Sequence, residues 1–470
     1  MAAESKELSF LRSSLLRESP CFDNSDFLSW FRECEASNAF RVRPIPFDAM
    51  DQWSFEPGTR NLVHDSGRFF RIEGLRVETN FGDDTRWDQP IINQPEIGIL
   101  GILSKRFGGV LHFLMQAKAE PGNINTLQLS PTVQATRSNF SQVHGGHVPS
   151  YLEYFSQAPA ERRLVDQLQT EQGSRFLKKR NRNMIVEVED EVSVLDDFRW
   201  LTLGEIKRLQ GLENFVNMDA RSVISCIPYV DREPRAADSP EARALEGFEK
   251  DLLTSVYAES SAMHSMDALL AWITEMKTRF ELRAETIPLA DVGNWEITES
   301  EIVHESRRYF SVIAVAVEAG KREVARWTQP LLMDATTGLH GFITQKHGGL
   351  LHFLVQAKVE PGNVDVVDLA PTVSLSNIEH KRERSSEYPF LDRFLELDAD
   401  EIRYSVIQSE EGGRFFHMEN LNTILELDAD EVLDVPEHFT WMTLGQLLEL
   451  LKHGYLSVDA RTLLSCASWI

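Results

Sequence analysis

Residues 111–123 read LHFLMQAKAEPGN, and residues 351–363 repeat this stretch as LHFLVQAKVEPGN. A Gly-Gly pair stands just before each copy. Because successive side chains of a strand point to opposite faces, the odd and even positions separate into two sets. The odd set is apolar and consists of Leu111, Phe113, Met115, Ala117 and Ala119. The even set carries the polar residues His112, Gln116, Lys118 and Glu120. We therefore predict a strand that buries its odd positions.

The polar row recurs in the second copy, where it consists of His352, Gln356, Lys358 and Glu360. A base, an amide, a cation and an acid on one face suit the floor of a ligand pocket. The alternative is a ladder of hydrogen bonds that serves the fold in both copies. His112 and Lys118 would stand roughly 20 Å apart on an extended strand, so one small ligand would not contact both. His112 therefore has two interpretations, a ligand-binding group or a satisfied core histidine.

Composition narrows the classes of function. The 470 residues carry a formal net charge of −25, which argues against non-specific binding to nucleic acid or anionic membranes. The start of the sequence lacks the apolar core of a signal peptide, and no long uncharged span follows. The four cysteines are scattered and form no C-x-x-C motif. We therefore expect a cytoplasmic protein that binds neither nucleic acid nor a membrane.

The similarity between the two stretches extends over most of the chain. At an offset of 240, residues 131–133 and 371–373 both read Pro-Thr-Val. A repeat of this length indicates a duplicated domain rather than a solenoid. We predict two tandem α+β domains, residues 1–235 and 236–470, in which mixed sheets pack against helices.

Local signals locate several helix starts. Two capping boxes are expected, Thr202 with Glu205 and Thr443 with Gln446. Asp219 and Asp459 fit the N-cap of the final helix in each copy, so we expect a structural role for both.

With the LHFLxQAKxEPGN motif, its duplication and the Pro-Thr-Val that follows, the sequence resembles the NDP-hexose 2,3-dehydratases over residues 27–470. The resemblance implies two Nudix-like domains, a homodimer, and a role in deoxysugar and antibiotic biosynthesis. It implies a dTDP-linked 4-keto-6-deoxyhexose as substrate and an NAD(P)H-dependent 3-ketoreductase as the next enzyme. The Glu-rich run with which Nudix hydrolases hold metal does not occur in the sequence, so metal-dependent hydrolysis is a poor fit.

The implied reaction removes the proton on sugar carbon 3, expels the 2-hydroxyl and gives a 3,4-diketo-2,6-dideoxyhexose. It requires a base, an acid and a group that stabilises the enolate oxygen, but no redox cofactor. We assign no cofactor and no metal ligands. The predicted catalytic residues are Glu120, Lys118, Tyr151 and His112.

The predicted substrate-binding residues come from both copies. They are Gln116, Arg137, His144, Arg175, Arg182, His352, Gln356, Lys358, Glu360 and Arg414. Residues 134–155 of the first copy offer polar and aromatic groups that the second copy lacks, which favours the first copy as the catalytic one. Catalysis in both copies stays open, as does the alternative of a non-catalytic nucleotide-sugar binding protein.

Overall fold

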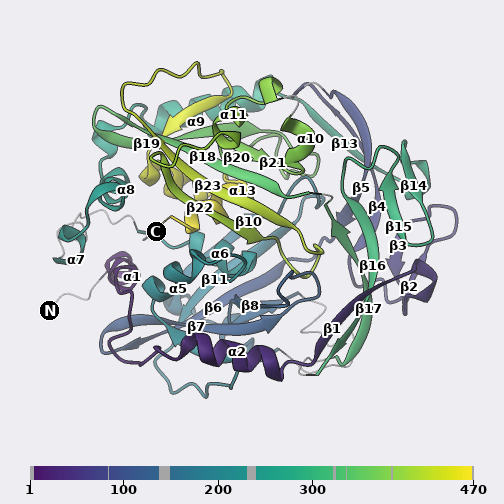
Figure 1. Cartoon of the computed structure of the whole chain (residues 1–470), viewed down its shortest axis with the longest axis horizontal. Helices are drawn as coiled ribbons and strands as arrows, with labels where there is room; N and C mark the ends of the chain where they lie inside the picture. The colour runs from purple at the N-terminus through teal and green to yellow at the C-terminus, as the bar shows by residue number, and fades with distance from the viewer. Residues whose placement is uncertain are drawn as a thin grey trace.

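The computed structural model describes residues 5–82, 84–136, 149–229, 240–320, 324–334, 336–382 and 385–467. Arg137 and His144, two of the predicted substrate-binding residues, lie outside these ranges. The described chain is α+β, as predicted, and its strands form four sheets. Figure 1 shows two large sheets on one side of the molecule and two smaller sheets on the other.

The first large sheet is built from the first half of the chain. Its strand order is β10-β11-β6-β7-β12, with β8 beside β7 and β9 beside β6. The strands are β6 Gly98–Phe107, β7 Val110–Ala119, β8 Leu127–Ser130, β9 Val133–Ala135, β10 Arg163–Thr170, β11 Arg180–Glu187 and β12 Phe198–Leu201. β6 and β11 run parallel, and the other neighbours run antiparallel.

The second large sheet repeats this plan in the second half, with the order β22-β23-β18-β19-β24. β20 pairs with β19, and β21 pairs with β18. The strands are β18 Gly338–His347, β19 Leu350–Lys358, β20 Asp368–Ala370, β21 Val373–Leu375, β22 Ile402–Ser409, β23 Glu419–Leu427 and β24 Phe439–Met442. The repeat read from the sequence is thus matched strand for strand.

The two smaller sheets each contain one strand from the other half. β1 (Phe40–Ile45) pairs antiparallel with β16 of the second half, and β13 (Leu282–Ile287) pairs antiparallel with β4 of the first half. The remaining strands are β2 Trp53–Phe55, β3 Leu62–His64, β4 Arg71–Thr79, β5 Arg86–Asn93, β14 Trp295–Ile297, β15 Glu301–His304, β16 Ser311–Ala319 and β17 Arg326–Met333. The halves are therefore interlocked by a reciprocal strand exchange, and the domain boundary at residues 235 and 236 stays a prediction.

The LHFLMQAKA part of residues 111–123 lies in β7, and residues 351–358 of the second copy lie in β19. The odd positions of β7 are buried, from Leu111 at 0% exposed to Ala117 at 5%, so this prediction is confirmed. Gly108 and Gly109 have φ of +56° and +84°, which a two-residue turn of type I′ between β6 and β7 requires. The Gly-Gly pair thus fixes the register of the strand.

Helices cover the outer and inner faces of the large sheets. The longer ones are α1 Lys6–Leu15, α2 Phe27–Ser37, α5 Leu203–Gln210, α6 Met218–Ser225, α8 Gly247–Tyr257, α9 Met266–Arg279, α12 Leu444–Lys452 and α13 Val458–Ser465. The shorter ones are α4 Glu153–Ser156, α7 Pro240–Arg243, α10 Ile378–Arg382 and α11 Leu391–Leu395. Both predicted capping boxes are present, at the starts of α5 and α12. None of the described helices is long and apolar enough to cross a membrane.

The N-caps predicted for the final helices are wrong. Asn217 caps α6, with its side chain accepting a hydrogen bond from the backbone N–H of Ala220, and Ser457 caps α13 in the same way. Asp219 and Asp459 stand two residues later, inside the first turn, and their carboxylates are available for other contacts.

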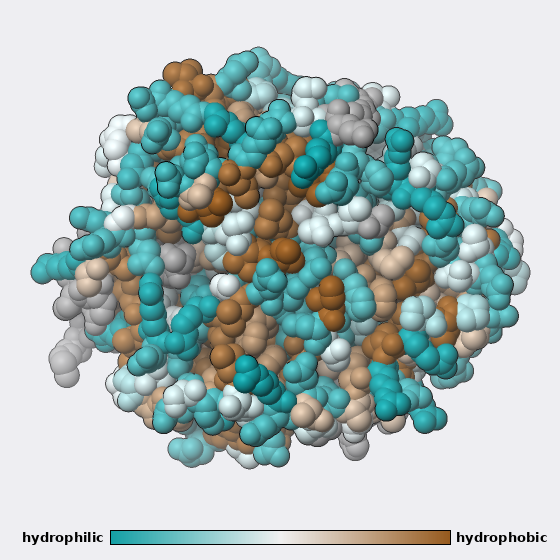
Figure 2. All heavy atoms as spheres, viewed as in Figure 1, coloured by the Kyte–Doolittle hydropathy of each residue, from teal (hydrophilic) through white to brown (hydrophobic). Residues whose placement is uncertain are grey.

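One large hydrophobic core joins the two halves. It contains Phe113 and Ile224 from the first half together with Phe353 and Leu464 from the second. Helices α6 and α13 pack against each other near the middle of Figure 1, so the final helix of each half buries its counterpart. On the face drawn in Figure 2, hydrophilic side chains dominate the periphery, and hydrophobic ones show mainly toward the centre.

Candidate active site

A cavity of about 520 Å³ opens beside the C-terminal end of β7. Lys118 and Glu120 of the predicted polar row line it. Lysine, arginine and carboxylate side chains line it, and the aromatic residues Trp53, Phe70 and Trp327 contribute to its wall. A volume of this order falls in the range of small-molecule sites.

The floor of the cavity is a chain of polar contacts centred on Gln134 of β9. Lys118 Nζ donates to Gln134 Oε1 at 2.5 Å and lies 3.3 Å from Glu120 Oε1. Gln134 Nε2 in turn donates to Glu120 Oε1 at 3.3 Å and to a carboxylate oxygen of Asp219. Burial raises the pKa of Asp219, and the nearby carboxylates Glu411 and Glu120 raise it further. The residue that the sequence suggested as a helix cap therefore belongs to the cavity.

A second set of polar residues lines the same cavity from β11 and from the segment between β10 and β11. Glu171 Oε1 accepts a hydrogen bond from Asn181 at 2.8 Å and lies 3.9 Å from the buried Arg461 of α13. Burial raises the pKa of Glu171 to about 7, although the charge of Arg461 opposes the rise. Burial lowers the pKa of Lys179 to about 8, although the charge of Glu171 opposes the fall. Both groups can therefore exchange protons near neutral pH.

A loop of the second half completes the cavity. Glu411, Gly413 and Arg414 line it, although they follow β22. The guanidinium of Arg414 lies 4.2 Å from the centre of the Phe70 ring, and its Nη2 donates to Gln94 Oε1 at 3.4 Å. The site is thus composite, with groups from both halves.

The equivalent arginine of the first half crosses in the opposite direction. Arg175 Nη2 lies 3.0 Å from Asp334 Oδ1, and its guanidinium lies 4.3 Å from the Phe310 ring. The two predicted arginines, Arg175 and Arg414, therefore each contact the half that does not contain them.

The Pro-Gly-Asn end of the LHFLxQAKxEPGN motif explains why each arginine reaches the other half. The backbone N–H of Gly122 donates to Gly412 O at 2.7 Å, and the N–H of His417 donates to Gly122 O at 2.7 Å. A Cβ atom on Gly412 would lie 2.1 Å from Asn123 Oδ1, so the two loops touch backbone to backbone. We call this contact the first clasp.

A second clasp repeats the contact with the halves reversed. Gly362 N–H donates to Gly173 O, and Lys178 N–H donates to Gly362 O, both at 2.7 Å. The Pro-Gly-Asn end of each motif therefore docks on the other half, and in doing so it places Glu120 beside the loop that carries Arg414.

The aromatic end of the cavity is also shared between the halves. Trp53 and Phe70 come from the first half, and Trp327 comes from β17 of the second. The backbone N–H of Asp51 donates to Thr328 Oγ1 at 2.9 Å, and that hydroxyl donates back to Asp51 O at 2.9 Å. The wall is thus held by cross-half hydrogen bonds.

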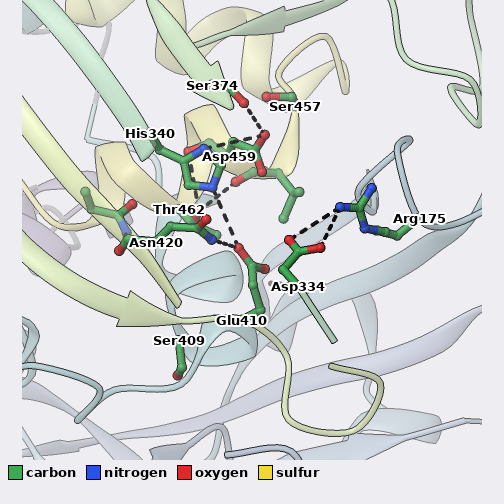
Figure 3. A network of polar contacts seen from close by, with 12 residues as sticks. Arg175, Asp334, His340, Ser374, Ser409, Glu410, Asn420, Ser457, Asp459 and Thr462 are labelled. Carbon is green, nitrogen blue, oxygen red and sulfur yellow. Dashed lines mark hydrogen bonds and ion pairs between the residues drawn. The ribbon is translucent and has the colours of Figure 1, made fainter. Parts of the chain in front are cut away.

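The matching place in the second half holds a network around His340 (Figure 3). The ring lies between Glu410, at 3.7 Å from Nε2, and Asp459, at 3.8 Å from Nδ1. Burial lowers the pKa of His340, but the two carboxylates outweigh it and the net pKa is raised. In the first half the equivalent position is Leu100, which lines the cavity. Lys358 and Glu360 repeat the pair of the first floor at 2.8 Å.

Comparisons with known proteins agree with the repeat and with the motif. The profile of the NDP-hexose 2,3-dehydratase family matches residues 24–227 and again residues 266–467. The chain belongs to the NDP-hexose 2,3-dehydratase family. A relative from Saccharopolyspora spinosa, named dTDP-4-dehydro-6-deoxy-alpha-D-glucopyranose 2,3-dehydratase, is 46% identical over 458 residues, covering 97% of this chain and 93% of its own.

Two further relatives carry the same name. The one from Amycolatopsis orientalis is 47% identical over 448 residues, covering 94% of this chain and 89% of its own. The one from Streptomyces violaceoruber is 43% identical over 449 residues, covering 94% and 97%. The family is one of hydro-lyases, so this family member is an enzyme of that kind.

The structure of this dehydratase-family member argues against a catalytic His112. Its ring is fully buried and does not line the cavity. Nδ1 lies 3.0 Å from Val110 O, and Nε2 lies 2.7 Å from Ser19 Oγ. Burial lowers its pKa. His352 is held alike by Leu350 O and the N–H of Met263, so both are satisfied core histidines.

Tyr151 also lies away from the cavity, contrary to its predicted catalytic role. Its hydroxyl donates to Ser193 O at 2.8 Å and accepts from the N–H of Leu195 at 3.0 Å. Its ring packs edge-on against Phe198 at 4.9 Å. Both bonds of the hydroxyl are used by backbone, so Tyr151 anchors residues 193–195.

Three other predicted residues do not reach the cavity. Arg182 pairs with Asp166 at 2.6 Å on the outer side of β10 and β11. Gln116 donates to Asp197 Oδ2 at 2.9 Å. Gln356 is half-buried on β19, opposite Phe439 of β24. Of the predicted residues that the structure describes, the cavity brings together Lys118, Glu120 and Arg414.

Several lining residues were not predicted from the sequence, namely Gln134, Glu171, Lys179, Asp219 and Glu411. A signal for two of them was present, because residues 170–176 and 409–415 repeat one another as TEQGSRF and SEEGGRF. No three His, Cys, Asp or Glu side chains in the described part of the chain are grouped to hold a metal ion.

Proposed function

We propose that this enzyme eliminates water from a dTDP-linked 4-keto-6-deoxyhexose and forms a 3,4-diketo-2,6-dideoxyhexose. The observation that carries the proposal is the composite cavity, in which the Lys118–Glu120 pair and Arg414 face one volume of about 520 Å³. The names of the three relatives, all dTDP-4-dehydro-6-deoxy-glucopyranose 2,3-dehydratases, support this substrate class.

The chemistry of the walls suggests how the substrate lies. Trp53, Phe70 and Trp327 offer faces on which a thymine ring can stack. Arg414 packs on Phe70, and its charge also interacts with Glu411 and Glu120, so it stands between the aromatic and the acidic parts. A guanidinium at that position suits a diphosphate, because its paired donors match phosphate oxygens. The sugar would then lie over Lys118 and Glu120.

Lys118 and Glu120 have complementary roles in this arrangement. Glu120 Oε1 accepts a hydrogen bond from Gln134 and lies 3.3 Å from Lys118 Nζ, whereas Glu120 Oε2 has no hydrogen-bond partner among the described residues. We therefore propose Glu120 as the base that removes the proton on carbon 3. Lys118 stabilises the negative charge that develops on the 4-oxygen of the enolate.

The second half offers a related floor. We propose that Lys358 and Glu360, with Arg175 nearby, bind a nucleotide sugar there. His340 fills the place of Leu100 and pairs with two carboxylates, which argues for a binding rather than a catalytic role.

The wider setting rests on the family resemblance. We propose two Nudix-like domains with a boundary near residues 235 and 236, a homodimer, and a place in antibiotic deoxysugar biosynthesis ahead of an NAD(P)H-dependent 3-ketoreductase. A cytoplasmic location fits the four cysteines, all in the described part of the chain and none in a disulfide.

The function is tested by incubating the protein with dTDP-4-keto-6-deoxyglucose and a 3-ketoreductase, which traps the unstable diketo sugar. We expect a 2-deoxy sugar nucleotide by mass and by NMR. dTDP-glucose, which lacks the 4-ketone, should give no product, because its carbon 3 proton is not acidified. Tight binding of the keto sugar without any turnover would support a nucleotide-sugar binding protein instead.

A further inference from the structure

We propose that Glu411, contributed by the second half of the chain, protonates the departing 2-hydroxyl in the cavity of the first half. This inference rests on the proposed function, since it adds the acid to the elimination described there. It makes Glu411 a catalytic residue of a site whose floor belongs to the other half.

The first support is the position of Glu411 in the cavity. It stands in the loop that the first clasp holds, next to Gly412, which bonds Gly122 of the motif. Its side chain lines the cavity together with Lys118 and Glu120. The clasp therefore holds this carboxyl in the same cavity as the proposed base.

The second support is how the carboxyls of the cavity are engaged. Glu120 and Asp219 both accept hydrogen bonds from Gln134, and Glu171 accepts one from Asn181. The carboxyl of Glu411 makes no hydrogen bond or close ion pair with any residue that the structure describes. A half-buried carboxyl that is directed into a cavity and lacks a protein partner is placed to bond a ligand.

The surroundings of Glu411, burial above all, favour its protonated form. Burial raises its pKa, and Glu120 and Glu171 raise it further, while Arg414 and Lys179 oppose the rise. A proton donor for a hydroxide leaving group must be protonated near neutral pH before the elimination. With Glu120 as the proposed base and Glu411 as the acid, two carboxyl groups in different surroundings divide the two roles.

The third support is the difference between the two halves. The loops read EEGGRF at residues 410–415 and EQGSRF at residues 171–176, so the counterpart of Glu411 is Gln172. Both loops make the same backbone turn, in which the N–H of the arginine donates to the carbonyl of that residue. Both loops keep the arginine and the first glutamate of the stretch. They differ at the second position, which is Glu411 in one loop and Gln172 in the other. An amide cannot supply a proton, so the second-half site lacks this group.

The proposed elimination moves one proton to Glu120 and another from Glu411. Glu120 takes the proton from carbon 3, and the electron pair of that bond forms the enolate with the 4-oxygen. Collapse of the enolate forms the double bond between carbons 2 and 3 and breaks the bond from carbon 2 to oxygen. The Glu411 carboxyl transfers its proton to that oxygen, so water leaves and Glu411 becomes a carboxylate. The resulting enol takes a proton at carbon 2 and releases the proton of its 3-hydroxyl, so carbon 3 becomes a ketone and the diketo sugar forms.

The test compares three variants of the full-length protein. Glu411→Gln copies the loop of the first half and should lower turnover by at least about a hundredfold, the scale of losing one general acid. Glu411→Asp should recover part of that loss. The matched control Gln172→Glu should leave turnover at the wild-type level. Affinity for dTDP should be unchanged in all three, which shows that the cavity is intact.

Two further readouts separate an acid from a group that merely shapes the cavity. With a 2-deoxy-2-fluoro analogue of the keto sugar, fluoride leaves with little need for a proton, so Glu411→Gln should approach wild type. In D₂O, Glu411→Gln should still exchange the proton on carbon 3, because Glu120 is untouched. Equal losses with the hydroxyl and fluoro substrates, or wild-type turnover of Glu411→Gln, would overturn the inference. Failure of the wild-type protein to form any product would overturn the proposed function itself.

Discussion

The guanidinium of Arg414 lies 4.2 Å from the centre of the Phe70 ring, although the two residues belong to different halves of the chain. Its counterpart Arg175 lies 4.3 Å from the ring of Phe310 in the same manner. Each half of the chain therefore places one arginine against an aromatic ring of the other half. The two crossings give matched pairs of variants with which the halves can be tested separately.

The arginines supply the first pair. Arg414→Lys keeps the charge but loses the paired donors that suit a diphosphate, so KM should rise roughly tenfold or more, the scale of one hydrogen bond to a charged group. Arg175→Lys should leave KM for the sugar nucleotide close to wild type. Steady-state kinetics on both variants decides the matter, with thermal unfolding as the control for folding. A larger rise in KM for Arg175→Lys would place the reaction in the second half.

Tyr151→Phe tests whether the hydroxyl of Tyr151 has a structural rather than a catalytic role. The change removes a hydroxyl that bonds Ser193 O and the N–H of Leu195, both far from the proposed chemistry. Turnover should stay within about twofold of wild type, while the free energy of unfolding falls by about 1–2 kcal/mol. Urea titration and turnover measured on one preparation check both numbers. A hundredfold loss of turnover at unchanged stability would restore Tyr151 as a catalytic residue.

The clasps can be disturbed one at a time. A Cβ on Gly412 would lie 2.1 Å from Asn123 Oδ1 and 2.9 Å from Glu120 Cβ, and a Cβ on Gly173 would meet Asn363 and Glu360 in the same way. Both alanine variants should lose about 1–3 kcal/mol of stability through overpacking.

Their activities should differ, however. Gly412→Ala displaces Glu120 in the cavity and should reduce turnover at least tenfold, whereas Gly173→Ala displaces Glu360 and should retain most of it. Turnover is compared at a temperature where both variants remain folded by circular dichroism. Equal losses in the two would mean that the clasps act on stability alone.

His340 should make stability depend on pH. Its folded pKa is raised by Asp459 and Glu410 against the effect of burial. A raised pKa contributes stability that is fully present below the unfolded pKa and is lost as pH rises through the folded value. The free energy of unfolding of wild type relative to His340→Leu should therefore be larger at about pH 6 than at about pH 9.

Denaturant titrations of both proteins at the two pH values measure this difference. His340→Leu is a suitable control because leucine occupies the equivalent position, Leu100, in the first half. A difference that grows toward high pH would show that the histidine is neutral in the folded protein.

The parts of the fold that follow local patterns could be predicted from the sequence. The alternation in residues 111–119 gave the buried face of β7, and the Thr-x-x-Glu and Thr-x-x-Gln spacings gave two capping boxes. The prediction of Asp219 as the cap of α6 failed because Asn217, two residues earlier, caps equally well in isolation. The tertiary contact between Asp219 and Gln134 decided it.

The composition of the site could be predicted only in part, because it depends on pairings between distant segments. Lys118 and Glu120 were found since they share one strand face. The side-chain hydrogen-bond partner of His112 is Ser19, which no strand pattern indicates. The first clasp brings Glu411 and Arg414 into the cavity of the first half. Each repeat considered by itself would place these two residues in the second half.

The exchange of β1 and β13 also has a consequence for how the protein is made. A ribosome completes β4 long before its partner β13 has been synthesised, so one edge of β4 stays unpaired on the nascent chain. β1 likewise waits for β16, and contacts of such sequence separation form slowly. The first half therefore cannot finish its own cavity during translation. Catalytic competence should arise only after the last strands of the second half have left the ribosome.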